Sequence, residues 1–468
     1  MTLILNVLWP NLSTILSYTG NFLTLMAQLG NSGIQTQQYL IMLIYCRKIK
    51  MTKENQVSES EFKRDAKLDS FENLISRIKQ DLVTRLCESA ETGAEALVRR
   101  EERQLEVRGD FSLPSLTSKT WDRHRLRDSA SPSLLLSSNC PSGRKEKEIR
   151  LDEESELGFV LRIERVGEAK RGTVTLHLDR ASVIKYYVHN ASKERGDGEN
   201  RTTILASSCD SSSPSSLTGF RVKILTECLN RLPLASEVAV SSASFPDEVS
   251  SIKVKVGPVL GDSGKKYEGQ TVEQLKERVK ENIDKLDEER RDEREPAEET
   301  QERLDRLTNA FLNFALLSSS ISNSAKMDMD SQKSHFVMYN KARSTKLLVT
   351  FDEQVRRGIY PEVPGNLDNV DFSLLSEPDE WEIVWGHLTM VDEVIEHCSR
   401  VLSLHKLVNL LYSLATTYSR YYNRVKILKD PLPTLIPTIH ARVVLCRQID
   451  AAFARLLHIL GCKTLDMM

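Results

Sequence analysis

A regular stripe of apolar residues between positions 403 and 428 constrains the fold of this chain more than any other feature. Its members are Leu404, Leu407, Val408, Leu411, Leu414, Ala415, Tyr418, Tyr421, Tyr422 and Val425. Steps of three and four residues place them on one face of an α-helix, and that face must be buried. The stretch "KDPLP" at 429–433 ends the helix, since proline has no amide hydrogen to donate.

Three further stretches of the last third have the same helical character. They cover residues 335–351, 380–402 and 435–461. Gly461 stands where a helix commonly ends in a left-handed residue. Long amphipathic helices joined by short connections pack side by side, so we expect residues 333–468 to form an all-α antiparallel helix bundle.

The rest of the chain is predicted to be a mixed, loop-rich region, and changes in composition divide it into segments. Residues 51–127 are predicted to be helical, because apolar residues recur at helical spacing between 60 and 108. A linker rich in Ser, Pro and Gly follows at 128–148. Residues 149–262 indicate a small α/β region, with β structure at 158–187, a Ser-rich break at 206–218, a helix at 219–232 and a strand at 250–260.

A segment dense in charges of both signs occupies residues 268–312. Leu275, Val279, Ile283 and Leu286 form one narrow apolar stripe. We expect a solvated helix with a single packed face, broken or kinked at Pro296. A coiled-coil dimer, the alternative, would need several uninterrupted heptads.

The first 50 residues form an apolar extension with no charged side chain before Arg47. Polar residues interrupt it too often for a membrane span of about 20 apolar residues. A secretory signal would begin with basic residues, which are missing here. We interpret the extension as an upstream segment that is not native, with Met51 as a second candidate start; a membrane anchor is the alternative.

Charge and cysteine usage limit the classes of function. The net charge is −2, so any surface that binds nucleic acid must be local. Eight cysteines are scattered without a C-x-x-C pair, which favours reduced thiols, a cytoplasmic protein and no metal site.

Catalytic motifs are missing from the sequence. The stretch "GPVLGDSGKKY" at 257–267 departs from a phosphate-binding loop, because Val259 and Lys266 stand where glycine and a hydroxyl residue are required. Histidines form no metal-binding or triad spacing. These observations favour a binding protein without a cofactor over an enzyme.

Three stretches of the C-terminal third resemble the DALR anticodon-binding domain of arginyl-tRNA synthetases. They are "FVMYNKARSTKLL", "LVNLLYSLATTYSRYYNRVKIL" and "ARVVLCRQIDAAFARLLHILG", in the order and spacing of that domain. The synthetase H-x-G-H motif is missing, and the chain ends in "TLDMM" where the domain ends P-E-R-M. Together with "VDFSLLSEPDEW", this pattern resembles the DALR anticodon-binding domain-containing protein 3 family.

The resemblance implies a non-catalytic tRNA-binding adaptor. Members of that family are linked to arginine tRNA and to a methyltransferase that forms 3-methylcytidine in the anticodon loop. The adaptor would recognise the tRNA and its partner would supply the chemistry. A protein-docking scaffold that uses a DALR-like bundle without RNA binding is the alternative.

RNA loops are bound by aromatic or guanidinium stacking and by cationic contacts with phosphates. Tyr421 and Tyr422 point about 100° apart on a helix, so both cannot lie fully in the core. We predict that Tyr418 and Tyr421 pack in the core, while packing and RNA contact stay open for Tyr422 and Arg424. The tRNA-contact candidates are Tyr339, Lys341, Arg343, Lys346, Tyr422, Asn423, Arg424, His440, Arg447 and Arg455. The predicted structural residues are Arg442, Trp381, Trp385, Tyr418 and Tyr421.

Overall fold

The structure is a computed structural model in which the described residues belong to one compact unit, Lys67–Met468. The described residues are 74–87, 94–101, 105–114, 149–150, 162–169, 173–193, 216–232, 238–241, 252–261, 271–288, 297–329 and 331–465. The extension predicted at 1–50 and the linker predicted at 128–148 lie outside these ranges.

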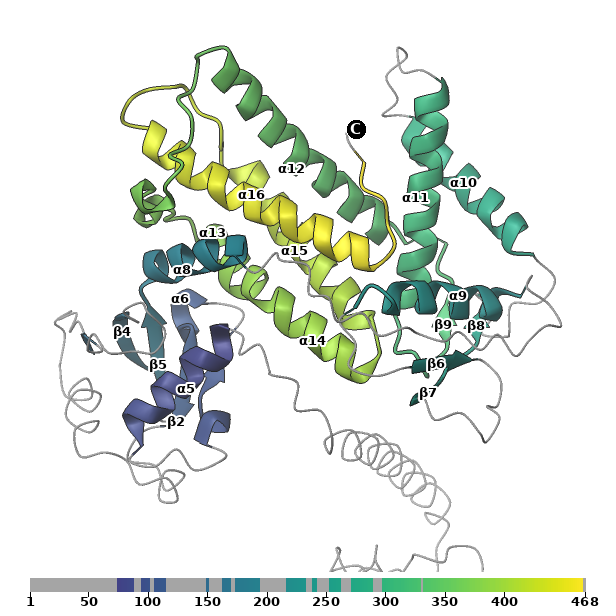
Figure 1. Ribbon diagram of the computed structural model, residues 1–468, viewed down its shortest axis with the longest axis horizontal. Coiled ribbons are helices and arrows are strands. Elements are labelled where there is room, and N and C mark those ends of the chain that lie inside the picture. The colour runs from purple at the N-terminus through teal and green to yellow at the C-terminus, as the bar shows by residue number, and fades with distance from the viewer. Residues whose placement is uncertain are drawn as a thin grey trace, which may run out of the picture. The chain divides into compact units, whose positions relative to one another are not determined.

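An antiparallel sheet with strand order β1-β2-β5-β4-β3 forms the first part of the described chain (Figure 1). The strands of the sheet are β1 (Arg99–Arg100), β2 (Phe111–Pro114), β3 (Ile149–Arg150), β4 (Arg162–Ala169) and β5 (Thr173–Leu178). The helices of the same part of the chain are α5 (Leu74–Leu86), η1 (Ala94–Leu97) and α6 (Leu105–Arg108). The helical prediction for 51–127 is confirmed at α5 and α6 and is wrong at β1 and β2. Residues Phe111 and Leu113 alternate with less buried neighbours in β2, the period of a half-buried strand.

Helix α8 (Arg180–Lys193) follows β5 directly. The β structure predicted for 158–187 is therefore confirmed at β4 and β5 and wrong from Arg180 onward. The Asp179 carboxylate accepts hydrogen bonds from the Ala181 amide (3.2 Å) and the Ser182 hydroxyl (2.5 Å), which is how an N-cap starts a helix. Val183, Ile184 and Val188 are buried at helical spacing.

The middle of the chain contains one helix and two short parallel strand pairs. They are α9 (Leu217–Leu229), the pair β6 (Val238–Ser241) and β7 (Ile252–Lys255), and the pair β8 (Val259–Leu260) and β9 (Ala325–Lys326). The helix predicted at 219–232 is confirmed. The strand predicted at 250–260 is found as two short strands, β7 and β8, which belong to different pairs. Arg221 of α9 is fully buried and donates to the carbonyls of Leu316, Gly257, Asn323 and Ser320 and to the Ser319 hydroxyl.

The charged segment contains two described helices that pack against each other. The first buries a single face, as predicted, whereas the second half of the other is buried on several sides. Helix α10 (Val272–Glu288) buries Leu275, Val279 and Ile283. Helix α11 (Ala297–Leu317) begins directly after Pro296 and packs against α10 and α12. The break predicted at Pro296 lies outside the described residues, since α10 is described to Glu288 and α11 from Ala297.

The last third is the predicted helix bundle (Figure 1). Lys341 of α12 pairs with Asp450 of α16, while Phe351 nearer the end of α12 packs with Ile439 at the start of α16, so these helices are antiparallel. The elements are α12 (Lys333–Arg356), η3 (Leu367–Asn369), η4 (Phe372–Leu374), α13 (Pro378–Gly386), η5 (Leu388–Met390), α14 (Val391–Val401), α15 (His405–Arg424) and α16 (Ile436–Ile459).

One predicted helix of the bundle is divided in two. The helix expected over 380–402 ends at Gly386, and η5 separates it from α14. His387 leaves helical geometry with φ of −131°, and its buried imidazole Nε2 is 2.9 Å from the Thr417 hydroxyl on α15.

The end of α16 is as predicted, because Gly461 has φ of +69°, the left-handed conformation expected of a C′ glycine. Among the described helices, none is long and apolar enough to cross a membrane.

Candidate functional site

Three of the predicted contact residues meet in one cluster, although they come from two helices far apart in sequence. The Arg343 guanidinium carbon of α12 lies 4.4 Å from the Tyr339 ring centroid and 4.6 Å from the Tyr422 ring centroid of α15. Arg343 Nη2 also donates to the Tyr339 hydroxyl at 2.7 Å. We call Tyr339, Arg343 and Tyr422 the tyrosine–arginine cluster.

The helical stripe explains why Tyr422 reaches this cluster. Tyr418 and Tyr421 are fully buried, while Tyr422 is half-buried and packs its ring 6.0 Å from that of Tyr418. The core therefore takes two of the three tyrosines and leaves Tyr422 at its boundary. Burial raises the pKa of both Tyr418 and Tyr421 well above the usual value of 10, so both stay neutral phenols.

The tyrosine–arginine cluster can stack on planar groups and attract anions. A guanidinium keeps its charge at any physiological pH and stacks on aromatic faces. Arg343 Nη1 is buried without a hydrogen-bond partner among the described residues. Such a donor normally finds a water or a ligand.

A second cation–aromatic contact lies on the same two helices, and the sequence reasoning missed it. The Lys333 ammonium of α12 lies 5.6 Å from the Tyr412 ring centroid of α15, and the Phe336 ring lies 5.9 Å from the same ring. We call Lys333, Phe336 and Tyr412 the lysine–aromatic cluster. Its sequence signal is that Lys333 precedes Arg343, and Tyr412 precedes Tyr422, by the same ten residues.

This equal offset shows how α12 and α15 are oriented relative to each other. Contacts at Lys333–Tyr412 and Arg343–Tyr422 mean that α12 and α15 run in the same direction. Ten helical residues rise about 15 Å. The two clusters therefore form a row, about 15 Å long, along the side-by-side helices α12 and α15.

Arg424 is exposed but paired with the start of α13. Its Nη1 lies 2.8 Å from Asp379 Oδ2, and Arg420, one turn earlier, places Nε 2.8 Å from Asp379 Oδ1 and Nη2 2.6 Å from Glu382 Oε2. Asn423 next to it is exposed. The charge of Arg424 is thus shared with carboxylates of the protein.

Arg442 lies in a buried polar network centred on Glu380. The Glu380 carboxylate is fully buried and accepts from Arg442 Nε at 2.8 Å and from the Tyr421 hydroxyl at 2.9 Å. Its other oxygen accepts from the Glu377 amide at 2.9 Å as part of a capping box. One carboxylate therefore connects α13, α15 and α16.

The remaining candidates of α12 differ in exposure. Lys341 is buried and places its ammonium 2.8 Å from Asp450 Oδ1. The Ser344 and Thr345 hydroxyls donate to the same oxygen, so Lys341 belongs to the packing between α12 and α16. Lys346 is exposed.

The candidates of α16 do not form one surface. The buried His440 imidazole Nε2 lies 3.1 Å from the Pro361 carbonyl. Arg447 pairs with Asp352 of α12 at 3.4 Å, and Arg455 pairs with Asp392 of α14 at 2.5 Å. These three side chains reach three different parts of the protein.

Trp381 and Trp385 of α13 connect the bundle to the sheet. Their rings stack at 5.3 Å, and Phe111 of β2 packs edge-on against Trp385. Trp381 Nε1 donates to Asp110 at 2.7 Å, and Trp385 Nε1 donates to the Glu101 carbonyl at 2.9 Å. Both tryptophans thus lie buried between segments about 280 residues apart.

Metal and thiol chemistry find little support in the described ranges. There, no group of three or more His, Cys, Asp or Glu side chains could hold a metal ion. Five free cysteines of this part of the chain are buried. Burial raises the pKa of Cys228, Cys446 and Cys462 to about 12, which leaves them protonated and unreactive.

Comparison with known proteins identifies the bundle. Residues 337–468 match the family of the DALR anticodon binding domain. This match confirms the resemblance found in the sequence, and the fold is a mixed one with a C-terminal helix bundle of the DALR type.

The chain is similar to two groups of known proteins. It is 32% identical over 163 residues to the DALR anticodon-binding domain-containing protein 3 of Danio rerio, covering 31% of this chain and 29% of that protein. It is 27% identical over 247 residues to an arginine–tRNA ligase of Prochlorococcus marinus, covering 50% of this chain and 38% of that protein. The solved arginyl-tRNA synthetase of Thermus thermophilus aligns with a TM-score of 0.39 at 16% identity, over 50% of this chain and 41% of that chain. The chain thus spans about a third of the relatives that it matches.

Proposed function

We propose, from the DALR-type anticodon-binding domain at residues 337–468, that this protein binds tRNA through the row of clusters along α12 and α15. The tyrosine–arginine cluster carries the proposal: Arg343 lies within 4.6 Å of two tyrosine ring centroids. Stacking platforms of this kind bind the splayed bases of RNA loops. Lys333 and the exposed Lys346 add cations for the phosphates on the same helix.

The proposal extends to a cytoplasmic, non-catalytic adaptor. Its tRNA would be arginine tRNA, because the relatives include arginine–tRNA ligases and because the sequence resembles the DALR anticodon-binding domain-containing protein 3 family. A partner methyltransferase would form 3-methylcytidine in the anticodon loop. The predicted domains at 51–127, 149–262 and 268–312 would provide partner contacts or further tRNA contacts.

Salt-dependent binding tests the proposal. The full chain should bind an arginine tRNA transcript more tightly than an unrelated tRNA, and the affinity should fall steeply as salt rises, because neutralising phosphates releases counterions. Fluorescence anisotropy at several salt concentrations measures both effects. Equal affinity for the two tRNAs would reject the arginine-specific adaptor, and no binding of either would reject the tRNA-binding function.

A protein-docking scaffold is the second candidate function. It is favoured by one observation: Arg424, Arg447 and Arg455, three predicted RNA-contact cations, each pair with a carboxylate of the protein. Purification of the full chain from cells, followed by sequencing of bound RNA and mass spectrometry of bound proteins, separates the two functions. Proteins without tRNA would support the scaffold.

A further inference from the structure

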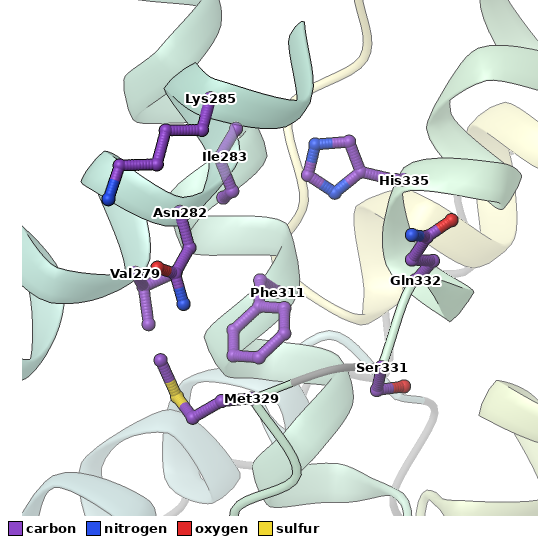
Figure 2. A pocket seen from close by; sticks show the side chains of 9 residues that line it. All are labelled: Val279, Asn282, Ile283, Lys285, Phe311, Met329, Ser331, Gln332 and His335. Carbon is purple, nitrogen blue, oxygen red and sulfur yellow. The ribbon is translucent and has the colours of Figure 1, made fainter.

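A pocket at the start of α12 lies next to the row of clusters. Residues of α10 and α11, together with Met329, Ser331, Gln332 and His335, line an open pocket with a volume of about 350 Å³ (Figure 2). This is near the small end of the roughly 300–1,000 Å³ of small-molecule pockets. The pocket fits one planar group of moderate size and is too small for a folded segment.

The floor of the pocket is apolar. Val279 and Ile283 of α10, Phe311 of α11 and Met329 line it. In Figure 2 the Phe311 ring lies between the α10 side chains and those of the α12 start. Apolar and aromatic side chains of this kind cover the face of a base that has left its stack.

The rim of the pocket is polar and carries paired donors and acceptors. Asn282 and Gln332 each offer a carboxamide, which has an acceptor oxygen and donor hydrogens side by side, and the His335 imidazole lies on the same side as Gln332. Base edges have the same alternation of donors and acceptors. Lys285 adds a positive charge at the rim.

The pocket and the lysine–aromatic cluster both use the start of α12: the pocket lies toward α10 and α11, and the cluster lies toward α15. Gln332 and His335 line the pocket, Lys333 and Phe336 form the lysine–aromatic cluster, and Arg343 stands two to three turns further on. A strand that follows α12 past both clusters would therefore arrive at the pocket.

We propose that this pocket holds a single unstacked nucleotide of the bound tRNA, with its base on the Phe311 side and its edge against Asn282 and Gln332. The inference rests on the proposed function, since it assigns the next contact of the same RNA strand. A side chain of a protein partner is the competing occupant.

Paired variants of the full chain test the pocket. Gln332→Leu and Asn282→Leu keep the side-chain size but remove the amide, and each should weaken binding of an arginine tRNA transcript by about three- to tenfold, as expected for one lost hydrogen bond. Gln354→Leu, near the other end of α12, is the matched control and should bind like the parent. Photo-crosslinking of tRNA that contains 4-thiouridine should label peptides covering 329–335.

Each contrary result has a separate meaning. If both pocket variants bind tRNA as tightly as the control while Tyr422→Ala binds weakly, the pocket proposal is wrong and the tRNA-binding function stands. If the pocket variants lose a co-purifying protein but keep tRNA affinity, the pocket binds a partner's side chain and the nucleotide proposal is again wrong. If the parent binds no tRNA, both proposals are wrong.

Discussion

Single side chains of this protein differ in how their charge is used. Lys341 and Arg442 are buried beside carboxylates, and Arg424 pairs with Asp379 at the surface. Arg343 instead places its guanidinium against the rings of Tyr339 and Tyr422. Aromatic rings do not neutralise a cation, so the positive charge of Arg343 can still attract a nearby phosphate.

Replacing Tyr422 should separate stacking from packing. We expect Tyr422→Ala to weaken tRNA binding about tenfold, as for the loss of one base–aromatic stack, and to lower the free energy of unfolding by roughly 0.5–3 kcal/mol, because the half-buried ring packs against Tyr418. Tyr422→Phe keeps the ring and should bind within about twofold of the parent on the same stacking argument. Fluorescence anisotropy with an arginine tRNA transcript measures both, and equal binding by all three proteins would remove Tyr422 from the interface.

At the scale of elements, the nine-residue helix α13 connects several other parts of the protein. Its acidic start pairs with Arg420, Arg424 and Arg442, while its tryptophans meet the sheet. The capping box at Glu377 and Glu380 fixes where α13 begins. A short helix that would be marginal alone is thereby held in one position between α15, α16 and β2.

The buried pair in this network should be costly to break. Glu380→Gln leaves the Arg442 charge buried without its counter-charge, so we expect a loss of about 3–5 kcal/mol in the free energy of unfolding. Glu382→Gln is the matched control on the same helix, and its partly exposed pair with Arg420 should cost less than about 1 kcal/mol. Urea unfolding followed by circular dichroism compares them. Similar losses for the two variants would contradict the proposed role of Glu380.

At the scale of the molecule, the sheet and the bundle meet at a titratable group. Burial raises the pKa of Asp110 from 3.8 to about 6, although the Leu178 amide and the Trp381 indole donate to its carboxylate and Arg180 lies nearby. A raised pKa in the folded state means that folding takes up a proton between these values. Stability contributed by this group is therefore present below about pH 4 and is lost as pH rises through about 6.

Asp110→Asn should remove this dependence on pH. We expect the stability of the parent relative to the variant to fall by roughly 3 kcal/mol between pH 4 and pH 7, since one pKa unit corresponds to about 1.4 kcal/mol, and to stay level above pH 7. Urea unfolding at intervals of half a pH unit gives the difference. A difference that does not change with pH would show that Asp110 is not the titrating group.

Elements that depend on local sequence patterns could be predicted from the sequence, whereas elements that depend on contacts between distant residues could not. Helical periodicity identified α12, α15 and α16 because apolar residues recur along each helix at steps of three and four. It did not show that residues 439–446 of α16 are buried on all sides. The division between α13 and α14 escaped prediction, since it depends on the contact of His387 with Thr417. The sheet escaped in part because β1 and β2 are short and because β2 pairs with β5, a strand about 60 residues away.

The candidate site could likewise be predicted only in part, because its residues come together through tertiary structure. Tyr339, Arg343 and Tyr422 could be chosen singly by residue type, but no local pattern shows that two helices bring them together. Lys333, Phe336 and Tyr412 were missed because the ten-residue offset that they share with Arg343 and Tyr422 becomes informative only once α12 and α15 are known to lie side by side. The pairing of Arg424, Arg447 and Arg455 with carboxylates is likewise a matter of tertiary structure.

The two clusters are chemically different, and this has a consequence for the direction of a bound strand. One end of the row offers a guanidinium between two phenols, and the other offers an ammonium beside a phenol and a phenyl ring. Because α12 and α15 run in parallel, these unlike ends cannot be exchanged by any rotation of the surface. A polynucleotide has a 5′ and a 3′ end, so the row can favour one polarity of the strand over the other without contacting a specific base.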